Sequence, residues 1–187
     1  MHGHKIVNQQ NLHFITPTVV GWLDIFTRKI YKDIIIDSLK YCIDNKGLSV
    51  HAYVIMSNHV HLVISARDDH RLSDIIRDFK RHTSKAVIAE ILSNPKESRQ
   101  EWMVRLLKYF AKFNKNNKTY QLWRRDNHPV ELASDKWIAT KINYIHLNPV
   151  RAGLVGKAEH YLYSSAADYY ESSGLLPIDI IELDLLS

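Results

Sequence analysis

The segment HAYVIMSNHVHLVIS, residues 51–65, constrains the fold of this chain more than any other stretch. Two apolar, β-branched runs flank a short break at residues 56–58, which is typical of two strands joined by a tight turn. The second run opens with His59 and His61. Alternate side chains of a strand share one face, so these imidazoles should project together, about 7 Å apart. The sequence therefore predicts a β-hairpin that carries half of a candidate metal site.

Strands and helices alternate around this hairpin. Residues 12–22 are β-branched and aromatic and predict a first strand, with Pro17 interrupting it or placing it near an edge. Apolar residues then recur at helical spacing from residue 27 or 28 to about 45. Beyond the strands at 48–56 and 59–65, we predict helices over about 73–92, 100–113 and 134–148, an exposed loop over 114–118 and an extended segment over 120–132.

Cap residues mark the ends of the predicted helices. Gly47 follows the first helix, as expected for a residue that ends a helix in the left-handed region. Ser73 is the candidate N-cap of the helix after the hairpin, and Ser134 or Asp135 that of the last helix. Pro149 is expected to stop the last helix at Asn148, because a residue before proline is biased away from the helical region.

This order of elements favours an α+β fold. It fits the ferredoxin-like split β-α-β arrangement, an antiparallel sheet with helices on one face, here with an added C-terminal helix and tail. A chain of 187 residues with 45% apolar residues can bury a sizeable core. We therefore expect a single domain over residues 1–187, with a core at about 12–150 and a tail at about 151–187.

Charge and cysteine content narrow the classes of function. The formal net charge of +5 and the pI near 9.2 favour a polyanionic partner. The single cysteine, Cys42, cannot form an internal disulfide and lies in an apolar helical pattern, which indicates a core residue. The N-terminus does not resemble a signal peptide, and no apolar run approaches the ~18 residues of a membrane span. We expect a cytoplasmic protein that makes no membrane contact.

The predicted last helix could supply the second half of a site. Tyr144 and Asn148 are four residues apart and share a helix face, with Lys141 one turn earlier. A phenol can act as a nucleophile, and an amide oxygen can ligate a hard metal beside two imidazoles. The structural alternative is a tyrosine that packs on the core and an asparagine that caps the helix. A His-x-His pattern is also unspecific alone, since residues 2–4 hold a second copy.

Several motifs together resemble a known family. They are VGW at 20–22, MSNHVH at 56–61, IRDFKR at 76–81, LWRRDNH at 122–128 and YIHLNPVRAGLV at 144–155. The chain is similar, from about residue 14 to 170, to the single-tyrosine, His-hydrophobe-His transposases of bacterial insertion sequences. It is closer still to their relatives, the REP-associated tyrosine transposases, because Asn148 stands where many insertion-sequence members have glutamine.

The resemblance implies a catalytic mechanism and a set of site residues. His59, His61 and Asn148 would hold a divalent ion, Mg²⁺ or Mn²⁺, that polarises the scissile phosphate. Tyr144 would attack phosphorus and form a 5′-phosphotyrosine link with release of a 3′-OH. The implied substrate is single-stranded DNA, often with hairpins, in a bacterial cell. Lys141 and His128 are further candidates near the active site.

Binding of single-stranded DNA needs basic grooves and aromatic stacking surfaces. The candidate DNA-binding residues are Arg77, Lys80, Arg81, Lys85, Trp123, Arg124 and Arg125. Trp123 could instead be a buried core residue. The family includes monomers and homodimers, and the residues are compatible with both. Two other functions remain open: a non-catalytic nucleic-acid-binding protein of the same fold, and a metal-dependent nuclease that uses water in place of Tyr144.

Overall fold

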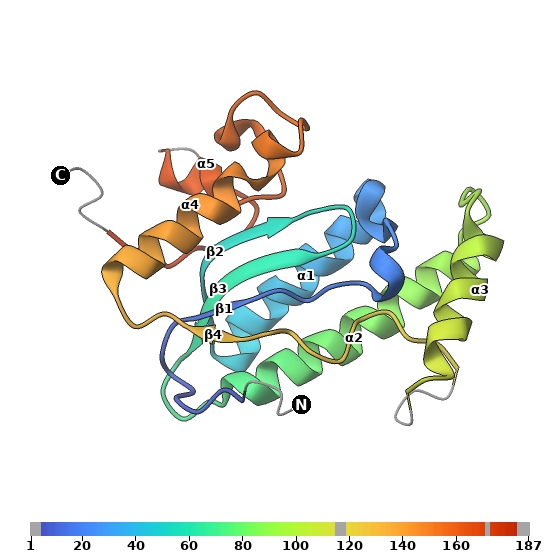
Figure 1. Ribbon diagram of the computed structural model, residues 1–187, viewed down its shortest axis with the longest axis horizontal. Helices are drawn as coiled ribbons and strands as arrows, with labels where there is room; N and C mark the ends of the chain where they lie inside the picture. The colour runs from blue at the N-terminus through green and yellow to red at the C-terminus, as the bar shows by residue number, and fades with distance from the viewer. Residues whose placement is uncertain (1–4, 115–118, 171–172, 183–187) are drawn as a thin grey trace.

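The computed structural model describes residues 5–114, 119–170 and 173–182 (Figure 1). A four-stranded antiparallel sheet with the order β2-β3-β1-β4 forms its centre. The strands are β1 (His13–Ile15), β2 (Leu48–Ile55), β3 (Val60–Ala66) and β4 (Val130–Glu131). This order, with helices in the β1–β2 and β3–β4 connections, is the split β-α-β arrangement, so the predicted ferredoxin-like α+β fold is confirmed.

Helices lie on both faces of the sheet. They are α1 (Lys29–Lys46), α2 (Leu72–Ser93), α3 (Gln100–Ala111), α4 (Asp135–Arg151) and α5 (Ala166–Tyr169), with 3-10 turns η1 (Val20–Trp22), η2 (Ile25–Thr27) and η3 (Ala158–His160). Helices α1 and α2 pack together behind the sheet, and α4 lies across the opposite face (Figure 1). Because His61 projects toward α4, the face that carries the histidines is the one that α4 covers.

The hairpin has the predicted form. Ile55 pairs with Val60, and the amide N–H of Met56 donates to the carbonyl of His59 at 2.9 Å, which closes the turn. His59 therefore lies immediately before β3 and His61 within it. Gly47 ends α1 in the left-handed region at φ 68°, as its position after the helix predicts.

Two predicted extended segments are shorter than expected. The strand predicted over 12–22 is regular only at His13–Ile15, after which Thr18 and Val19 form isolated bridges and the chain turns into η1. The segment predicted over 120–132 is irregular except for a bridge at Trp123 and the two residues of β4. Pro17 breaks the first strand as predicted, because a residue without an N–H cannot continue a ladder. Most of the loop predicted at 114–118 lies outside the described residues.

Two predicted helix boundaries are wrong. Ser73 does not cap α2, because Arg71 occupies the N-cap position and Ser73 lies inside the first turn. Pro149 does not stop α4, which continues to Arg151, with Ala152 as its C-cap and Gly153 just beyond at φ 70°. A proline removes one backbone donor, but the next donors are still used: Ala152 donates to the Asn148 carbonyl at 3.0 Å. Ser134 caps α4, as predicted, by accepting from the amide of Trp137.

The segment after α4 covers the free edge of β2. Ile55 donates its N–H to the Tyr163 carbonyl, Ser165 donates to the Tyr53 carbonyl, and Asp179 donates to the Val50 carbonyl. These bonds protect an edge that would otherwise be open to other chains. Across the residues described, we find no helix with the length and apolar character needed to cross a membrane.

Candidate active site

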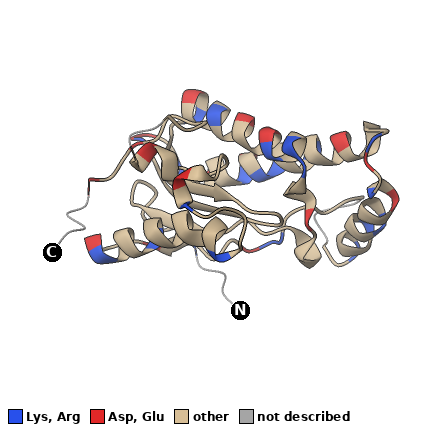
Figure 2. Cartoon of the chain, turned by 90° about the horizontal axis from the view of Figure 1, so that it is seen from above, with Lys and Arg blue, Asp and Glu red and all other residues tan. Residues whose placement is uncertain are grey.

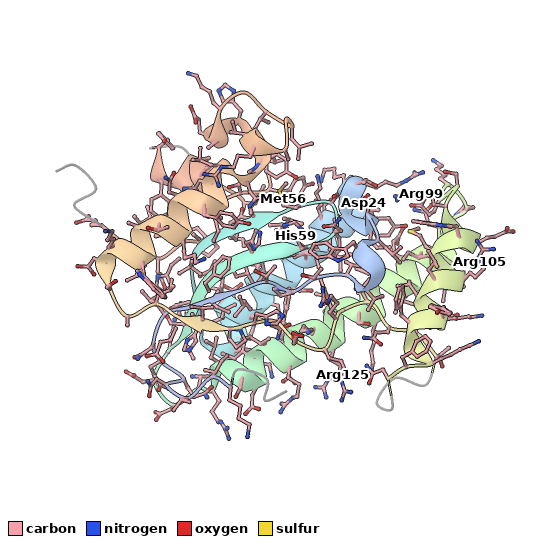
Figure 3. The ribbon with its side chains drawn as sticks, viewed as in Figure 1. Asp24, Met56, His59, Arg99, Arg105 and Arg125 are labelled. Carbon is pink, nitrogen blue, oxygen red and sulfur yellow. The ribbon has the colours of Figure 1, made fainter. Side chains whose placement is uncertain are left out.

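His59 and His61 lie side by side at the end of the sheet where β2 turns into β3. Their ring centres are 4.5 Å apart and their planes make an angle of 69°. His61 is only 5% exposed, stacked on Phe14 at 5.4 Å and in edge contact with Tyr144 at 5.2 Å. Figure 3 shows His59 and Asp24 near this end of the molecule. The period of the strand thus brings both imidazoles to the face that α4 covers.

Asn58 fixes the orientation and tautomer of His59. Its side-chain nitrogen donates to the carboxylate of Asp24 at 3.0 Å and to the carbonyl of Trp22 at 3.3 Å. The amide oxygen of Asn58 must therefore be the atom that lies 2.7 Å from Nδ1 of His59. Since that oxygen only accepts, Nδ1 carries the proton, and Nε2 keeps a free lone pair.

His61 is held in a similar way from β1. Its Nδ1 lies 2.9 Å from the hydroxyl of Thr16, and its Nε2 is buried with no hydrogen-bond partner. Burial, assisted by the charges of neighbouring His59 and Lys141, lowers the pKa of His61 to about 3. Burial also lowers the pKa of His59. Both rings are therefore neutral at ordinary pH, the form in which an imidazole ligates a metal.

A divalent ion fits this pair of histidines. A buried nitrogen without a partner is costly, and a metal bound at Nε2 of His61 would remove that cost. Among the residues described, no third His, Cys, Asp or Glu completes a ligand group. A third protein ligand would therefore be another oxygen donor, and the half-buried amide of Asn148 is on α4, one turn beyond Tyr144.

Tyr144 lies between His61 and two basic side chains. Its side chain is 37% exposed and also contacts Phe14 edge-on at 6.2 Å. The ammonium of Lys141 lies 5.7 Å from the centre of its ring, and the guanidinium of Arg151 lies 5.8 Å from it. This arrangement offers a solvent-accessible phenol beside cations that can stabilise negative charge on a bound phosphate.

Tyrosines of the C-terminal segment occupy different environments. Tyr161 and Tyr163 are buried, and burial raises the pKa of each to about 12, with further increases from Tyr163 and from Asp33 respectively. Tyr161 donates to the Ile55 carbonyl, and Tyr163 donates to Asp33. Burial also raises the pKa of Tyr169, which donates to the His51 carbonyl. These phenols hold the C-terminal segment in place and retain their protons.

The seven candidate DNA-binding residues line one groove. It has a volume of about 890 Å³ and lies between α2 and residues 119–127. It does not contain the histidines or Tyr144, which are on the other face of the sheet. Arg124 belongs to both regions, because it lines the groove and its guanidinium lies 5.9 Å from the ring centre of Trp22 beside His59. The groove and the candidate active site thus meet at Arg124.

The basic residues of the groove differ in availability. Arg77 is paired with Asp74 and Asp78, and Arg81 is paired with Asp78. Among the residues described, no ion pair engages Lys85, Arg124 or Arg125. Figure 2 accordingly shows basic and acidic residues interspersed along the helices rather than one basic face. Contact with a polyanion would therefore depend on a few exposed cations.

Lys80 and Trp123 support the structure of the groove. The ammonium of Lys80 donates to the Arg124 carbonyl at 2.7 Å and to Asn127 at 2.6 Å, and burial lowers its pKa to about 8. Trp123 is only 5% exposed and donates to the Thr83 hydroxyl at 2.9 Å. Its ring is packed in the core, as the structural alternative predicted, and has no open face for a base.

His128 is not part of the histidine cluster. It lies on the surface at φ 43°, with Nε2 3.3 Å from the carboxylate of Asp126. Among the described residues, the ring contacts of His59, His61 and Tyr144 do not include it. Lys141, by contrast, lies where its helical spacing from Tyr144 predicted, with its ammonium 4.7 Å from the ring centre of Phe14.

Four residues of this site were not identified from the sequence. Asn58 directly precedes His59, and its place in the turn was an available signal. Arg151 is seven residues after Tyr144 and shares its helix face, but the assumed stop at Pro149 removed it from the helix. Thr16 and Trp22 reach the histidines through the irregular end of β1; the VGW motif at 20–22 marked Trp22, but nothing in the local sequence indicated its contact with His59.

Replacement of Asn58 should weaken metal binding without removing a ligand. In Asn58→Ala, His59 loses the acceptor that fixes its tautomer, so we expect the affinity for Mn²⁺ to fall about 10- to 100-fold. Calorimetric titration of the metal-free protein measures this. Asn45→Ala is the control, because within the described part of the chain Asn45 donates to the Tyr41 carbonyl of its own helix, α1, and contacts neither histidine. Equal affinities of the two variants would contradict the role of Asn58.

Buried neutral histidines should make the fold sensitive to mild acid. The pKa of His146 is lowered to about 4 by burial, while an unfolded histidine titrates near ~6.5. Above about pH 6.5, His146 is neutral in both the folded and the unfolded state. Between about pH 6.5 and 4 only the unfolded chain takes up the proton, so the free energy of unfolding decreases as the pH is lowered through this range. Urea unfolding from pH 7 to about 5 should show this slope, and His146→Gln should reduce it. An unchanged slope in the variant would refute the assignment.

The chain is similar to transposases. Residues 7–119 match the family model "Transposase IS200 like", which covers more than half of the chain and ends before Tyr144. No curated protein sequence matches. Among solved structures, one described as a REP-associated tyrosine transposase bound to a REP hairpin aligns with a TM-score of 0.62 and 18% identity, over 100% of this chain and 94% of that one.

A second solved structure is a weaker match. It is described as a candidate transposase from Deinococcus radiodurans R1, and it aligns with a TM-score of 0.45 and 16% identity, over 78% of this chain and 95% of that one. The first structure supports the fold, and the family match covers the β2–β3 hairpin that carries both histidines. The chain belongs to the family of IS200-like transposases.

Proposed function

We propose that this transposase cleaves and rejoins single-stranded DNA, with Tyr144 as the nucleophile and a divalent ion, Mg²⁺ or Mn²⁺, held by His59, His61 and Asn148. The observation that carries the proposal is the contact between Tyr144 and His61. The ring centres are 5.2 Å apart, and Nε2 of His61 is buried without a partner. A partly exposed phenol next to an imidazole nitrogen that could ligate a divalent ion suits attack on a phosphate that such an ion would bind.

The reaction exchanges one phosphodiester for another. The phenol oxygen of Tyr144 forms a bond to phosphorus while the bond from phosphorus to the 3′-oxygen breaks. The phenol loses its proton and the departing 3′-oxygen gains one, which leaves a 5′-phosphotyrosine and a free 3′-OH. A bound divalent ion would act as a Lewis acid on a non-bridging oxygen. Lys141 and Arg151 flank Tyr144 and stabilise the negative charge of the phosphate in the transition state.

The substrate we propose is single-stranded DNA next to a hairpin. The solved structure of similar fold is described as bound to a REP hairpin, and this chain has a basic groove that reaches the active site. Lys85, Arg124 and Arg125 are the exposed cations positioned to contact phosphates there. In Figure 3, Arg125 extends outward next to α2, at some distance from His59. DNA backbone contact at these residues would make binding sensitive to salt.

A covalent adduct assay tests the proposed function. The full-length chain is incubated with Mn²⁺ or Mg²⁺ and labelled single-stranded DNA that carries the hairpins flanking its own gene, and products are separated on a denaturing protein gel. A labelled protein band that requires the metal supports the tyrosine mechanism. Metal-dependent cleavage without a band would indicate a hydrolytic nuclease, and binding without cleavage would indicate a binding protein.

A further inference from the structure

Trp22 is exposed without a structural reason for its exposure. Its side chain is 58% exposed, whereas Trp123, which forms an isolated bridge with Val19, is 5% exposed. Its backbone has φ 55°, a left-handed conformation that bulky residues rarely adopt. A large aromatic ring that is both exposed and held in a disfavoured conformation gains little from packing. Its value to the protein should then lie in what it contacts outside the chain.

The backbone around Trp22 is held firmly. Gly21, at φ 60°, packs so closely on α3 that a Cβ there would lie 2.5 Å from the ring of Phe110. The N–H of Val19 donates to the Asn58 carbonyl at 2.8 Å, and the carbonyl of Trp22 accepts from the Asn58 side chain. The same Asn58 orients His59. The position of the Trp22 ring is thus tied to that of the metal-binding imidazole.

Two neighbours of the Trp22 ring indicate the chemistry of its ligand. The centre of the Trp22 ring lies 6.3 Å from that of His59. Stacked bases in a strand are about 3.4 Å apart, so this distance corresponds to fewer than two nucleotides. The guanidinium of Arg124 lies 5.9 Å from the same ring centre. Arg124 is held in place because its N–H donates to the Thr18 carbonyl and its carbonyl accepts from Lys80. An exposed aromatic face beside an anchored cation suits a base with its attached phosphate.

We propose that Trp22 and Arg124 form a nucleotide-binding subsite that stacks one base of the single strand next to the scissile phosphate. The Trp22 ring supplies the stacking surface, and Arg124 contacts the phosphate of the same or the adjacent nucleotide. The subsite joins the active site to the groove lined by α2 and residues 119–127. It replaces Trp123 as the stacking tryptophan. This inference rests on the proposed function, since it assumes that DNA enters at His59.

Photocrosslinking tests the stacking contact directly. The probe is a single-stranded oligodeoxythymidine in which thymines are replaced by 5-iodouracil, irradiated with the full-length protein in the presence of Mn²⁺. We expect the crosslinked peptide to contain Trp22. A crosslink at other aromatic residues, with none at Trp22, would overturn the proposal. The readout needs no strand cleavage, so it is independent of whether Tyr144 is the nucleophile.

Binding of fluorescein-labelled oligodeoxythymidine, followed by anisotropy in a Tyr144→Phe background, gives a second test. Loss of one base–aromatic stack in Trp22→Ala should weaken binding about 5- to 150-fold, and Trp22→Phe should restore most of it. The carbonyl that holds Asn58 remains in both variants. Trp102→Ala is the control, because Trp102 is 41% exposed on α3. Equal affinity of Trp22→Ala and Trp102→Ala, with both folded by circular dichroism, would refute the subsite.

Discussion

Tyr144→Phe should abolish the covalent protein–DNA adduct and lower strand cleavage by about 10³-fold or more, the scale expected when a nucleophile is removed. The substitution removes one hydroxyl from a partly exposed ring. The contacts of that ring with His61 and Phe14 remain, so the fold and the histidine site should be unaffected. The measurement is the adduct assay on a denaturing gel, together with cleavage rates on the same DNA.

The matched control is Tyr170→Phe, which removes the hydroxyl of an exposed tyrosine in the C-terminal segment. It should cleave DNA at the wild-type rate. If Tyr144→Phe still cleaves DNA, and neither Tyr144→Phe nor Tyr170→Phe forms an adduct, water is the nucleophile. If Tyr144→Phe still forms an adduct, another tyrosine carries the reaction, and our assignment of Tyr144 is wrong.

His61→Ala should remove metal-dependent cleavage. The imidazole offers the buried Nε2, and its loss should eliminate detectable Mn²⁺ binding by calorimetry and reduce cleavage by about 10²-fold or more. The variant also leaves a cavity between Phe14 and Tyr144, which should lower the free energy of unfolding by about 1–3 kcal/mol. Thermal unfolding separates the two effects, since activity is compared below the transition.

His146→Gln provides the control for this second experiment. His146 is also a buried histidine of lowered pKa, but its Nε2 lies 2.9 Å from the Ser165 hydroxyl and it packs on Tyr169. Its replacement should lower stability and leave Mn²⁺ affinity unchanged. If both variants lose metal affinity equally, the effect comes from general destabilisation, and His61 is not a ligand.

Local patterns in the sequence were sufficient for the hairpin and for one face of the last helix. The period of two in a strand places His59 and His61 together, and the period of 3.6 in a helix aligns Lys141 with Tyr144. Both depend only on neighbours in the chain. The order of elements likewise allowed the sheet topology to be predicted, because few topologies accommodate that order.

Local patterns failed where long-range contacts decide the outcome. Pro149 disfavours a helix locally, but α4 continues past it and brings Arg151 to Tyr144. Lys80 and Trp123 belong to basic and aromatic motifs, but both side chains form hydrogen bonds to residues about 40 positions away or more. Lys80 donates to Arg124 and Asn127, and Trp123 donates to Thr83. The candidate residues line one groove, but the motifs did not predict the roles of these two side chains within it.

The residue types and their spacing thus established that the chain carries two imidazoles on one strand face and a phenol on one helix face. The folded chain determines that these faces meet, that Asn58 and Thr16 hold the two imidazoles, and that Trp22 rather than Trp123 has an exposed ring. The physical reason is the sequence distance over which each property is determined. The periodicity of side chains depends on backbone geometry within a few residues, whereas the burial of a side chain and the tautomer of a histidine depend on atoms that only the tertiary fold brings together.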